Sequence, residues 1–185
     1  MSKGNSLTFY GLFDIVDVIE IPILQRDYAQ GRTEESEVRT LFLNSLFEAL
    51  NLNENTARQT LDLDFVYGSF EDGNEKVFSV LDGQQRLTTL FLLHWYLAVE
   101  NKCSQNFRDR FMTSDGRSRF TYKTRPSTTE FFNMLISTDI VLLKGRVSDH
   151  IRDAQWFYLS WQQDPTVQAC MTMLDAIQIR FSGKS

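Results

Sequence analysis

The chain has 185 residues, of which 42% are hydrophobic and 13% aromatic. This is enough apolar material for one sizeable core, or for a domain with a helical extension. The 19 basic and 24 acidic residues give a net charge of -5, which excludes a protein held on nucleic acid by bulk electrostatics alone.

The cysteines and histidines do not have the spacing of a metal site or a disulfide framework. Cys103 and Cys170 lie far apart, and we expect His94 in the core and His150 on a solvated face. The sequence therefore predicts neither a zinc site nor a disulfide framework. Because acidic residues interrupt the early hydrophobic stretch, we expect neither export nor a membrane span, and a cytoplasmic location.

The first elements in chain order are short. LTFYGLFDI, residues 7–15, predicts a short helix or turn, and VIEIPIL, residues 18–24, predicts a strand. Pro22 confines that strand to a sheet edge or places it at a strand end. Apolar residues at helical spacing then run from about Glu34 to Ala49.

A β-hairpin and a buried helix are predicted next. LDLDFVYG, residues 61–68, has Leu61, Leu63, Phe65 and Tyr67 on one face, and the DGN turn at 72–74 connects it to KVFSVLD, residues 76–82. From residue 84 to about 101 apolar residues occur on every face, which predicts a buried central helix.

The second part of the chain has mainly helical patterns. We expect irregular chain over 102–118, a short strand in RFTYKTR at 119–125, and a helix that begins near Pro126. Two further helices are predicted over residues 147–161 and 166–181.

These patterns predict the α+β class, with a small mixed sheet and a central helix behind it. The change from mixed to helical patterns divides the chain into an α/β domain, residues 1–101, and a mainly helical extension, residues 102–185.

DGQQRLTTL, residues 82–90, places Arg86 in the first turn of the central helix. Asp82 and Gln85 form a capping box that needs no ligand. A cation such as Arg86 at the positive end of the helix dipole is, however, unfavourable by about 0.3 to 1 kcal/mol. A bound anion would make the electrostatic energy of this position favourable. Helix amides, a glycine and a guanidinium together make a phosphate site. We therefore expect Arg86→Ala to leave the unliganded protein as stable as the parent and to weaken phosphate binding.

IPILQRDY, residues 21–28, contains another Gln-Arg pair, Gln25 and Arg26, followed by Tyr28. In chain order we call IPILQRDY the first Gln-Arg segment and DGQQRLTTL the second. Because both pairs follow predicted strands, they are candidates to converge on one pocket. Gln reads a base edge or orients a water, Arg clamps a phosphate, and Tyr stacks on a base or ribose. The alternative is structural, with Arg26 paired to Asp27 or another acid and Tyr28 covering the core.

The order of these motifs resembles one known family. IPxxQRxY, a strand that ends in YGS and a strand that enters DGQQRLTTL resemble the GmrSD modification-dependent restriction enzymes. FTYKTRPSTTEFF and WQQDPTVQACMTMLDAI extend the resemblance over nearly the whole chain. It implies a ParB/sulfiredoxin-like amino-terminal domain whose DGQQR motif binds and hydrolyses a nucleoside triphosphate and so licenses DNA cleavage. By position, the implied catalytic residues are Asp82, Gln85 and Arg86, and the implied nucleotide-binding residues are Gln25, Arg26, Tyr28, Gly83 and Gln84.

The resemblance also implies a cofactor and partners. Triphosphates normally arrive with Mg²⁺, so we expect that ion, with a base that the sequence does not specify. Modified DNA and an HNH-type nuclease domain or subunit are the implied partners. Two isolated histidines cannot supply such a nuclease site, so we expect a fragment or a separate sensor subunit of a phage-defence system. Glutamine replaces the glutamate of the ParB box GERR, which favours nucleotide binding over hydrolysis.

Other functions remain open at the level of sequence. A non-hydrolysing module would use a nucleotide or DNA phosphate as a signal to a separate nuclease. A nuclease acting through the ParB-like fold is disfavoured, because the sequence has few histidines and few clustered carboxylates. A structural domain would use both motifs as caps and salt bridges. A local nucleic-acid contact or a solvated face is predicted for the basic cluster Arg117, Arg119, Lys123 and Arg125.

Overall fold

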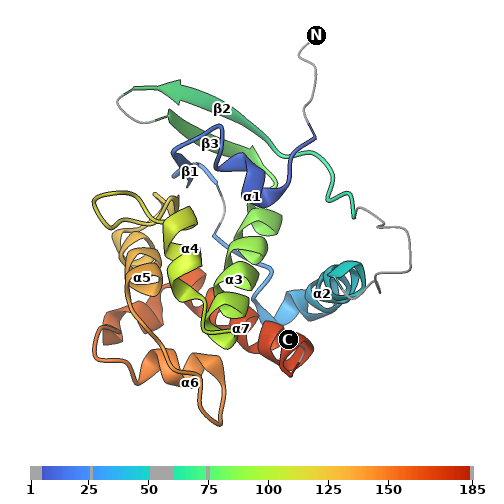
Figure 1. The fold of residues 1–185 in the computed structure, drawn as a ribbon, viewed down its shortest axis with the longest axis vertical. Coiled ribbons are helices and arrows are strands. Elements are labelled where there is room, and N and C mark those ends of the chain that lie inside the picture. The colour runs from blue at the N-terminus through green and yellow to red at the C-terminus, as the bar shows by residue number, and fades with distance from the viewer. Residues whose placement is uncertain (1–5, 26, 51–60, 74–75, 184–185) are drawn as a thin grey trace.

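The computed structural model of the chain describes residues 6–25, 27–50, 61–73 and 76–183 (Figure 1). The elements, including the 3₁₀ helices η1 and η2, are α1 (Phe9–Leu12), β1 (Val18–Ile21), η1 (Thr33–Glu35), α2 (Ser36–Leu50), β2 (Tyr67–Asp72), β3 (Lys76–Asp82), α3 (Gln84–Glu100), α4 (Ser104–Phe111), β4 (Phe120–Tyr122), α5 (Pro126–Ser137), α6 (Val147–Arg152), η2 (Leu159–Gln163) and α7 (Pro165–Phe181). The fold is α+β, as the sequence predicts.

A mixed four-stranded sheet has the order β2-β3-β1-β4. β1 runs parallel to both of its neighbours, β3 and β4, whereas β2 pairs antiparallel with β3. Ile19 of β1 lies opposite Phe78 of β3 and Phe120 of β4, and all three side chains are buried. Because Pro22 has no N–H to donate, β1 ends at Ile21, inside the sheet and not at its edge.

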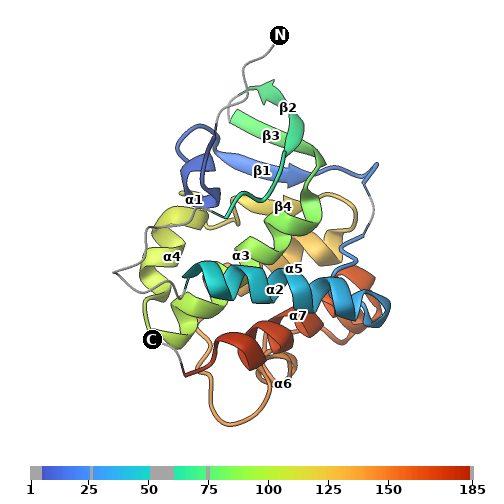
Figure 2. The ribbon, with the colours of Figure 1, turned by 90° about the vertical axis from the view of Figure 1, so that its right-hand side faces the viewer.

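The helices pack beneath the sheet, which occupies one end of the molecule in Figure 2. The central helix α3 contributes Phe91, whose ring stacks on Phe120 of β4 with centroids 5.1 Å apart and lies 5.4 Å from Phe132 of α5. Because β4 and α5 follow residue 102, residues on both sides of the predicted boundary share one sheet and one core.

The β-hairpin lies further along the chain than the alternating pattern predicts. Residues 61–66 have no regular secondary structure, and β2 begins only at Tyr67, so the prediction of a strand over 61–68 is wrong for most of its length. The carbonyls of Leu63 and Phe65 accept hydrogen bonds from Arg86 instead of a neighbouring strand. Part of the predicted DGN turn, Asn74, lies outside the described residues.

Two predictions in the second part of the chain are also wrong. α4 occupies part of the stretch predicted to be irregular, because Phe107 and Phe111 bury one face of an otherwise polar helix. The helix predicted over 147–161 ends at Arg152. There the N–H of Ala154 donates to the carbonyl of Ile151 at 3.2 Å, an i→i+3 bond that turns the chain towards η2.

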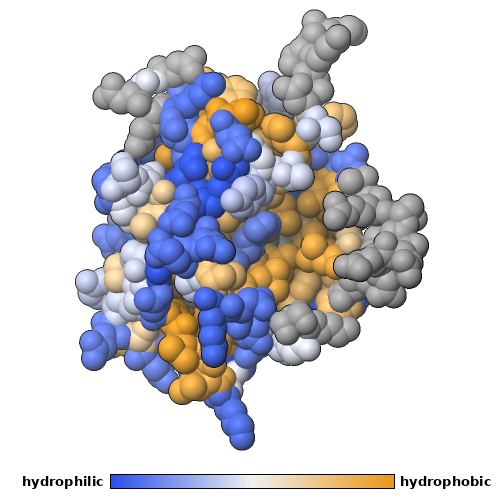
Figure 3. All heavy atoms as spheres, in the orientation of Figure 1, coloured by the Kyte–Doolittle hydropathy of each residue, from blue (hydrophilic) through white to orange (hydrophobic). Residues whose placement is uncertain are grey.

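The surface in Figure 3 is mixed, with hydrophobic residues gathered between α3 and α2 and at the end of the molecule opposite the sheet. Val141 and Leu143, on the connection from α5 to α6, are 73% and 70% exposed. Among the helices that the structure describes, none has the length and apolar character needed to cross a bilayer.

Candidate functional site

The candidate site lies where the three parallel strands end, which we call the carboxyl edge (Figure 2). β1 continues into residues 22–32, β3 continues through Gly83 into α3, and β4 continues through residues 123–125 into α5. The amino termini of α3 and α5 therefore lie near this edge, where their partial positive charges favour an anion. Open α/β sheets commonly bind ligands outside the carboxyl ends of their strands.

The side chain of Gln85 ties the start of α3 to the segment after β1. Its Oε1 accepts hydrogen bonds from the backbone N–H groups of Ala29, at 2.8 Å, and Gln30, at 3.0 Å. Its Nε2 donates to the carbonyl of Asp27 at 3.3 Å. Both ends of this amide are therefore occupied by residues 27–30, at the end of the first Gln-Arg segment and just after it.

A second amide makes the tie reciprocal. Gln25 Nε2 donates to the carbonyl of Leu81, the next-to-last residue of β3, at 2.9 Å. Two segments more than fifty residues apart in the chain are thus held together at the carboxyl edge. Arg26, predicted to share this site, lies outside the described residues.

The prediction of a capping box at the start of α3 is wrong. The N-cap is Gly83, with φ 90°, and no side chain caps the helix. Asp82 belongs to β3, and its carboxylate is 75% exposed and 3.8 Å from Arg86 Nη2. A Cβ at position 83 would lie 2.9 Å from Val66 Cγ2, so both the backbone angle and the close contact require glycine. Gln84, the first helical residue, is buried.

Arg86 reaches away from the first Gln-Arg segment, towards the residues that precede β2. Its Nη1 donates to the carbonyl of Leu63 and its Nη2 donates to the carbonyl of Phe65 at 2.7 Å. The carboxylates of Asp64 and Asp82 lie 3.7 and 3.8 Å from the guanidinium. Two carbonyls and two carboxylates therefore offset the cation at the helix start.

Tyr28, predicted to bind nucleotide, lies in the core instead of on the surface of the site. Its side chain is fully buried, its hydroxyl is 2.7 Å from Thr89 Oγ1, and its N–H donates to Thr166 Oγ1 at 3.3 Å. Burial raises the pKa of this hydroxyl well above its usual value. In this geometry the ring presents no face to a base or ribose. Its surroundings agree with the alternative that Tyr28 belongs to the core.

Asp27 brings two arginines together at the carboxyl edge. Arg125 donates from Nη1 to Asp27 Oδ1 at 2.6 Å and from Nη2 to Oδ2 at 3.4 Å. Arg32 Nη2 lies 3.6 Å from the same Oδ2. The arginine side chains are 41% and 44% exposed, and that of Asp27 is 22% exposed.

A buried carboxylate fixes the helix start that carries Arg125. Asp164 is 3% exposed and caps α7 by accepting from the N–H of Thr166 at 2.8 Å. It also accepts from the hydroxyls of Ser127 at 2.5 Å and Thr128 at 2.6 Å, in the first turn of α5. Arg125 is the N-cap of α5, so this network positions its backbone against α7.

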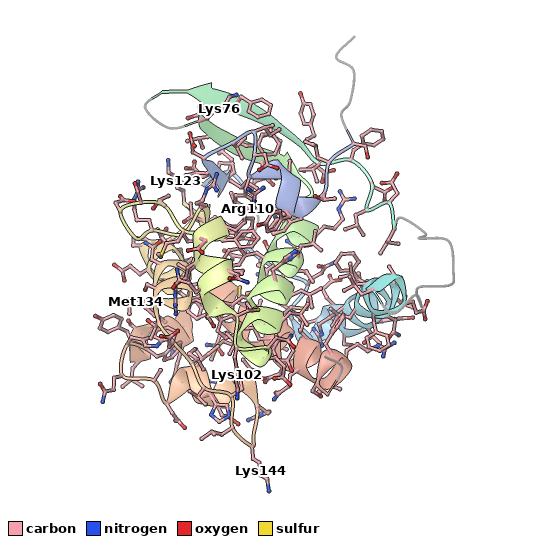
Figure 4. All side chains as sticks on the ribbon, in the orientation of Figure 1. Lys76, Lys102, Arg110, Lys123, Met134 and Lys144 are labelled. Carbon is pink, nitrogen blue, oxygen red and sulfur yellow. The ribbon has the colours of Figure 1, made fainter. Side chains whose placement is uncertain are left out.

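The predicted basic cluster divides between the two ends of β4. Arg119 precedes β4 and donates to the carbonyls of Phe13 and Val16. Lys123, labelled in Figure 4, follows β4 and pairs with Glu20 of β1 at 2.7 Å. Arg117 contacts Asp115 and Arg125 contacts Asp27. All four side chains are therefore engaged by carbonyls or carboxylates of the protein itself.

His94 is hydrogen-bonded and packs against the aromatic core, as predicted, with its side chain partly buried. Its ring packs 5.2 Å from that of Phe9 and 5.7 Å from that of Phe111, and Nδ1 lies 2.7 Å from the carbonyl of Leu90. Burial lowers the pKa of the imidazole. Across the described ranges, no group of three or more His, Cys, Asp or Glu residues could hold a metal ion.

The sequence motifs do not single out Asp27, Arg32 and Arg125 as site residues. From sequence, Asp27 is expected only as a partner of Arg26, and Arg125 only as part of the basic cluster. The missing signal is the pairing of β4 with β1, which brings residues 123–125 to the same edge as the two Gln-Arg segments. A three-residue strand gives no sequence sign of its partner.

Comparison with known proteins finds one family. The model of the GmrSD restriction endonuclease N-terminal domain matches residues 9–180, from the start of α1 to the last turn of α7. The match includes both Gln-Arg segments and the carboxyl edge. None of the curated proteins matches the chain.

Proposed function

Because the chain belongs to the family of GmrSD restriction endonuclease N-terminal domains, we propose that it is the nucleoside-triphosphate-binding sensor of a restriction system. Family membership supports the role in restriction, and the nucleotide is our inference from the site. The observation that carries it is the reciprocal tie between Gln25 and Leu81 and between Gln85 and residues 27–30.

The parts of a phosphate site meet at this tie. The first amides of α3 have no partner within the helix and point towards the carboxyl edge. Gly83, with φ 90°, makes the turn after which these amides begin. Because Gln85 bonds to residues 27–30, a ligand at the helix start also acts on the segment after β1. This connection suits a sensor, in which binding must be passed to another part of the protein.

The residues present fit a magnesium triphosphate in part. Asp82 offers one exposed carboxylate beside the start of α3, so Mg²⁺ would be held mainly by the phosphates and waters, with Asp82 as the protein ligand. When bound, the ion would neutralise phosphate charge.

Binding without hydrolysis is the second candidate, and Gln85 favours it. A water-orienting glutamine needs a free amide group, whereas Gln85 uses Oε1 for two N–H groups and Nε2 for a carbonyl. In a non-hydrolysing module the nucleotide would regulate a separate nuclease. In either case we assign DNA cleavage to an HNH-type domain or subunit. The DNA that the restriction system recognises is modified DNA.

Calorimetric titration of the protein with ATP, GTP, CTP and UTP, each with Mg²⁺, tests nucleotide binding. We expect at least one to bind, and absence of binding by all four would overturn the proposal. Phosphate release measured in parallel separates an NTPase from a non-hydrolysing sensor.

Asp82→Asn tests the proposed metal ligand. We expect a melting temperature close to that of the parent, because the side chain is 75% exposed, and loss of any hydrolysis. Asp139→Asn is the matched control, since Asp139 is a 78% exposed aspartate paired with an arginine, Arg108. Parent-like turnover in folded Asp82→Asn would remove Asp82 from the chemistry.

A further inference from the structure

The exposed guanidiniums of Arg32 and Arg125 lie on the flank of the carboxyl edge that the first Gln-Arg segment forms. Arg86 is turned to the other flank, where the carbonyls of Leu63 and Phe65 accept from it. Arg32 and Arg125 keep 44% and 41% of their side chains exposed, so a ligand in solution can reach both.

Both guanidiniums converge on one oxyanion. Asp27 receives two hydrogen bonds from the fork of Arg125, at 2.6 and 3.4 Å, and a further contact from Arg32 at 3.6 Å. Phosphate presents the same pattern of adjacent oxygens, and the arginine fork recognises phosphate and carboxylate alike. The pair is therefore already spaced to hold a phosphate.

The location of Arg125 strengthens this interpretation. As the N-cap of the 12-residue helix α5, it places a cation at the positive end of a helix dipole, where a cation is unfavourable. Asp27 and Asp164, whose Oδ1 is 3.8 Å from Nη1, offset that charge in this structure. A phosphate at the same position would meet both the guanidinium and the first amides of α5.

We propose that Arg32 and Arg125 form an anion clamp for the phosphate chain of the nucleotide, and that the carboxylate of Asp27 competes for this clamp. The assignment of the anion as a nucleotide rests on the proposed function, whereas the clamp itself rests on the geometry around Asp27. Phosphate binding releases Asp27. Because Gln85 Nε2 donates to the carbonyl of Asp27, that release also alters the contacts at the start of α3.

Titration with inorganic tripolyphosphate and with the four nucleoside triphosphates, each with Mg²⁺, tests the clamp. Arg125→Ala should weaken binding about ten- to a hundredfold, the range expected for lost charge-assisted bonds. Arg125→Lys keeps the charge but loses the fork, so it should lie between the parent and Arg125→Ala. Arg32→Ala should also weaken binding.

Arg146→Ala is a matched control. Arg146 is likewise the N-cap of a helix, α6, and donates to both oxygens of an aspartate, Asp149, at 3.0 and 3.1 Å. It should leave phosphate binding unchanged. Thermal melts of every variant establish that the proteins compared are folded.

Asp27→Asn separates a ligand clamp from a salt bridge that only supports the fold. The amide keeps the shape but removes the competing charge, so tripolyphosphate should bind several-fold more tightly than to the parent. Equal or weaker binding by folded Asp27→Asn overturns the competition between Asp27 and phosphate.

The outcomes distinguish the clamp from the nucleotide function. Nucleotide binding that is unchanged in folded Arg125→Lys and Arg32→Ala overturns the clamp and leaves the proposed function standing. If tripolyphosphate binds in an arginine-dependent way and no nucleotide binds, the result supports the clamp and overturns the proposed nucleotide-binding function. Absence of binding by every probe overturns both.

Discussion

Arg86 occupies the positive end of α3, where the dipole disfavours a cation by about 0.3 to 1 kcal/mol. Each hydrogen bond from a charged donor contributes about 1.5 to 3 kcal/mol, and Arg86 makes two, to the carbonyls of Leu63 and Phe65. The bonds outweigh the dipole. The position of Arg86 therefore has a structural explanation that does not require an anion: its two hydrogen bonds hold residues 61–66 against the start of α3.

Arg86→Ala should lower the free energy of unfolding by about 2 to 5 kcal/mol, since the loss of two bonds exceeds the gain in helix propensity and dipole energy. Chemical denaturation measures the change. Arg86→Lys should recover only part of the loss, because an ammonium lacks the fork that spans two carbonyls. A variant as stable as the parent would instead support the expectation drawn from sequence.

His94 makes stability depend on pH. Burial lowers its pKa below the ordinary 6.5, so near that pH the unfolded chain binds a proton that the folded protein does not. The contribution of neutral His94 is present above pH 6.5 and is lost as pH falls below it, by at most about 1.4 kcal/mol per pH unit. His94→Asn should flatten this slope in denaturation measured from pH 7.5 to 5. Identical slopes for parent and variant would contradict a lowered pKa of His94 in the folded protein.

At the scale of the elements, long periodic patterns predict well and short ones do not. The 17 residues of α3 and of α7 carry apolar residues over several turns, and both helices form where the sequence places them. LDLDFVYG has a strand pattern, yet Arg86 takes its carbonyls and β2 starts at Tyr67. α4 is missed because the two buried phenylalanines of its eight residues give too weak a period.

The turn from β3 into α3 depends on Gly83, and Gly116 allows a matched test. Both have positive φ, 90° and 86°, so alanine at either costs about 1 to 2 kcal/mol in backbone strain. A Cβ on Gly116 meets no atom within 4 Å, whereas one on Gly83 lies 2.9 Å from Val66 Cγ2. Gly83→Ala should therefore cost about 1 kcal/mol more than Gly116→Ala in chemical denaturation. Equal costs would show that Val66 moves aside freely.

At the scale of the whole molecule, the sequence predicts the α+β class but only part of the site. The two Gln-Arg segments can be placed at one edge because both follow predicted strands. Asp27 and Arg125 are 98 residues apart and meet only because β4 joins β1 in parallel. Such a long-range pairing depends on how the helices between the strands pack, which local patterns do not encode.

The sheet and core extend across the predicted boundary, so a chain ending at residue 101 should not fold. It would lose β4 beside Ile19, the ring of Phe120 that stacks on Phe91, and the hydroxyl of Thr166 that accepts from Tyr28. The first two losses expose apolar surface at about 25 cal/mol per Å², against a total stability of only about 5 to 15 kcal/mol, and the third removes the acceptor of the Tyr28 N–H. Calorimetry of the truncated chain should show no cooperative transition, and near-ultraviolet circular dichroism should show no fixed aromatic packing, whereas the full chain gives both. A cooperative transition in the truncated chain would instead establish residues 1–101 as an independent domain and would make α5 and α7 a separate layer added to it.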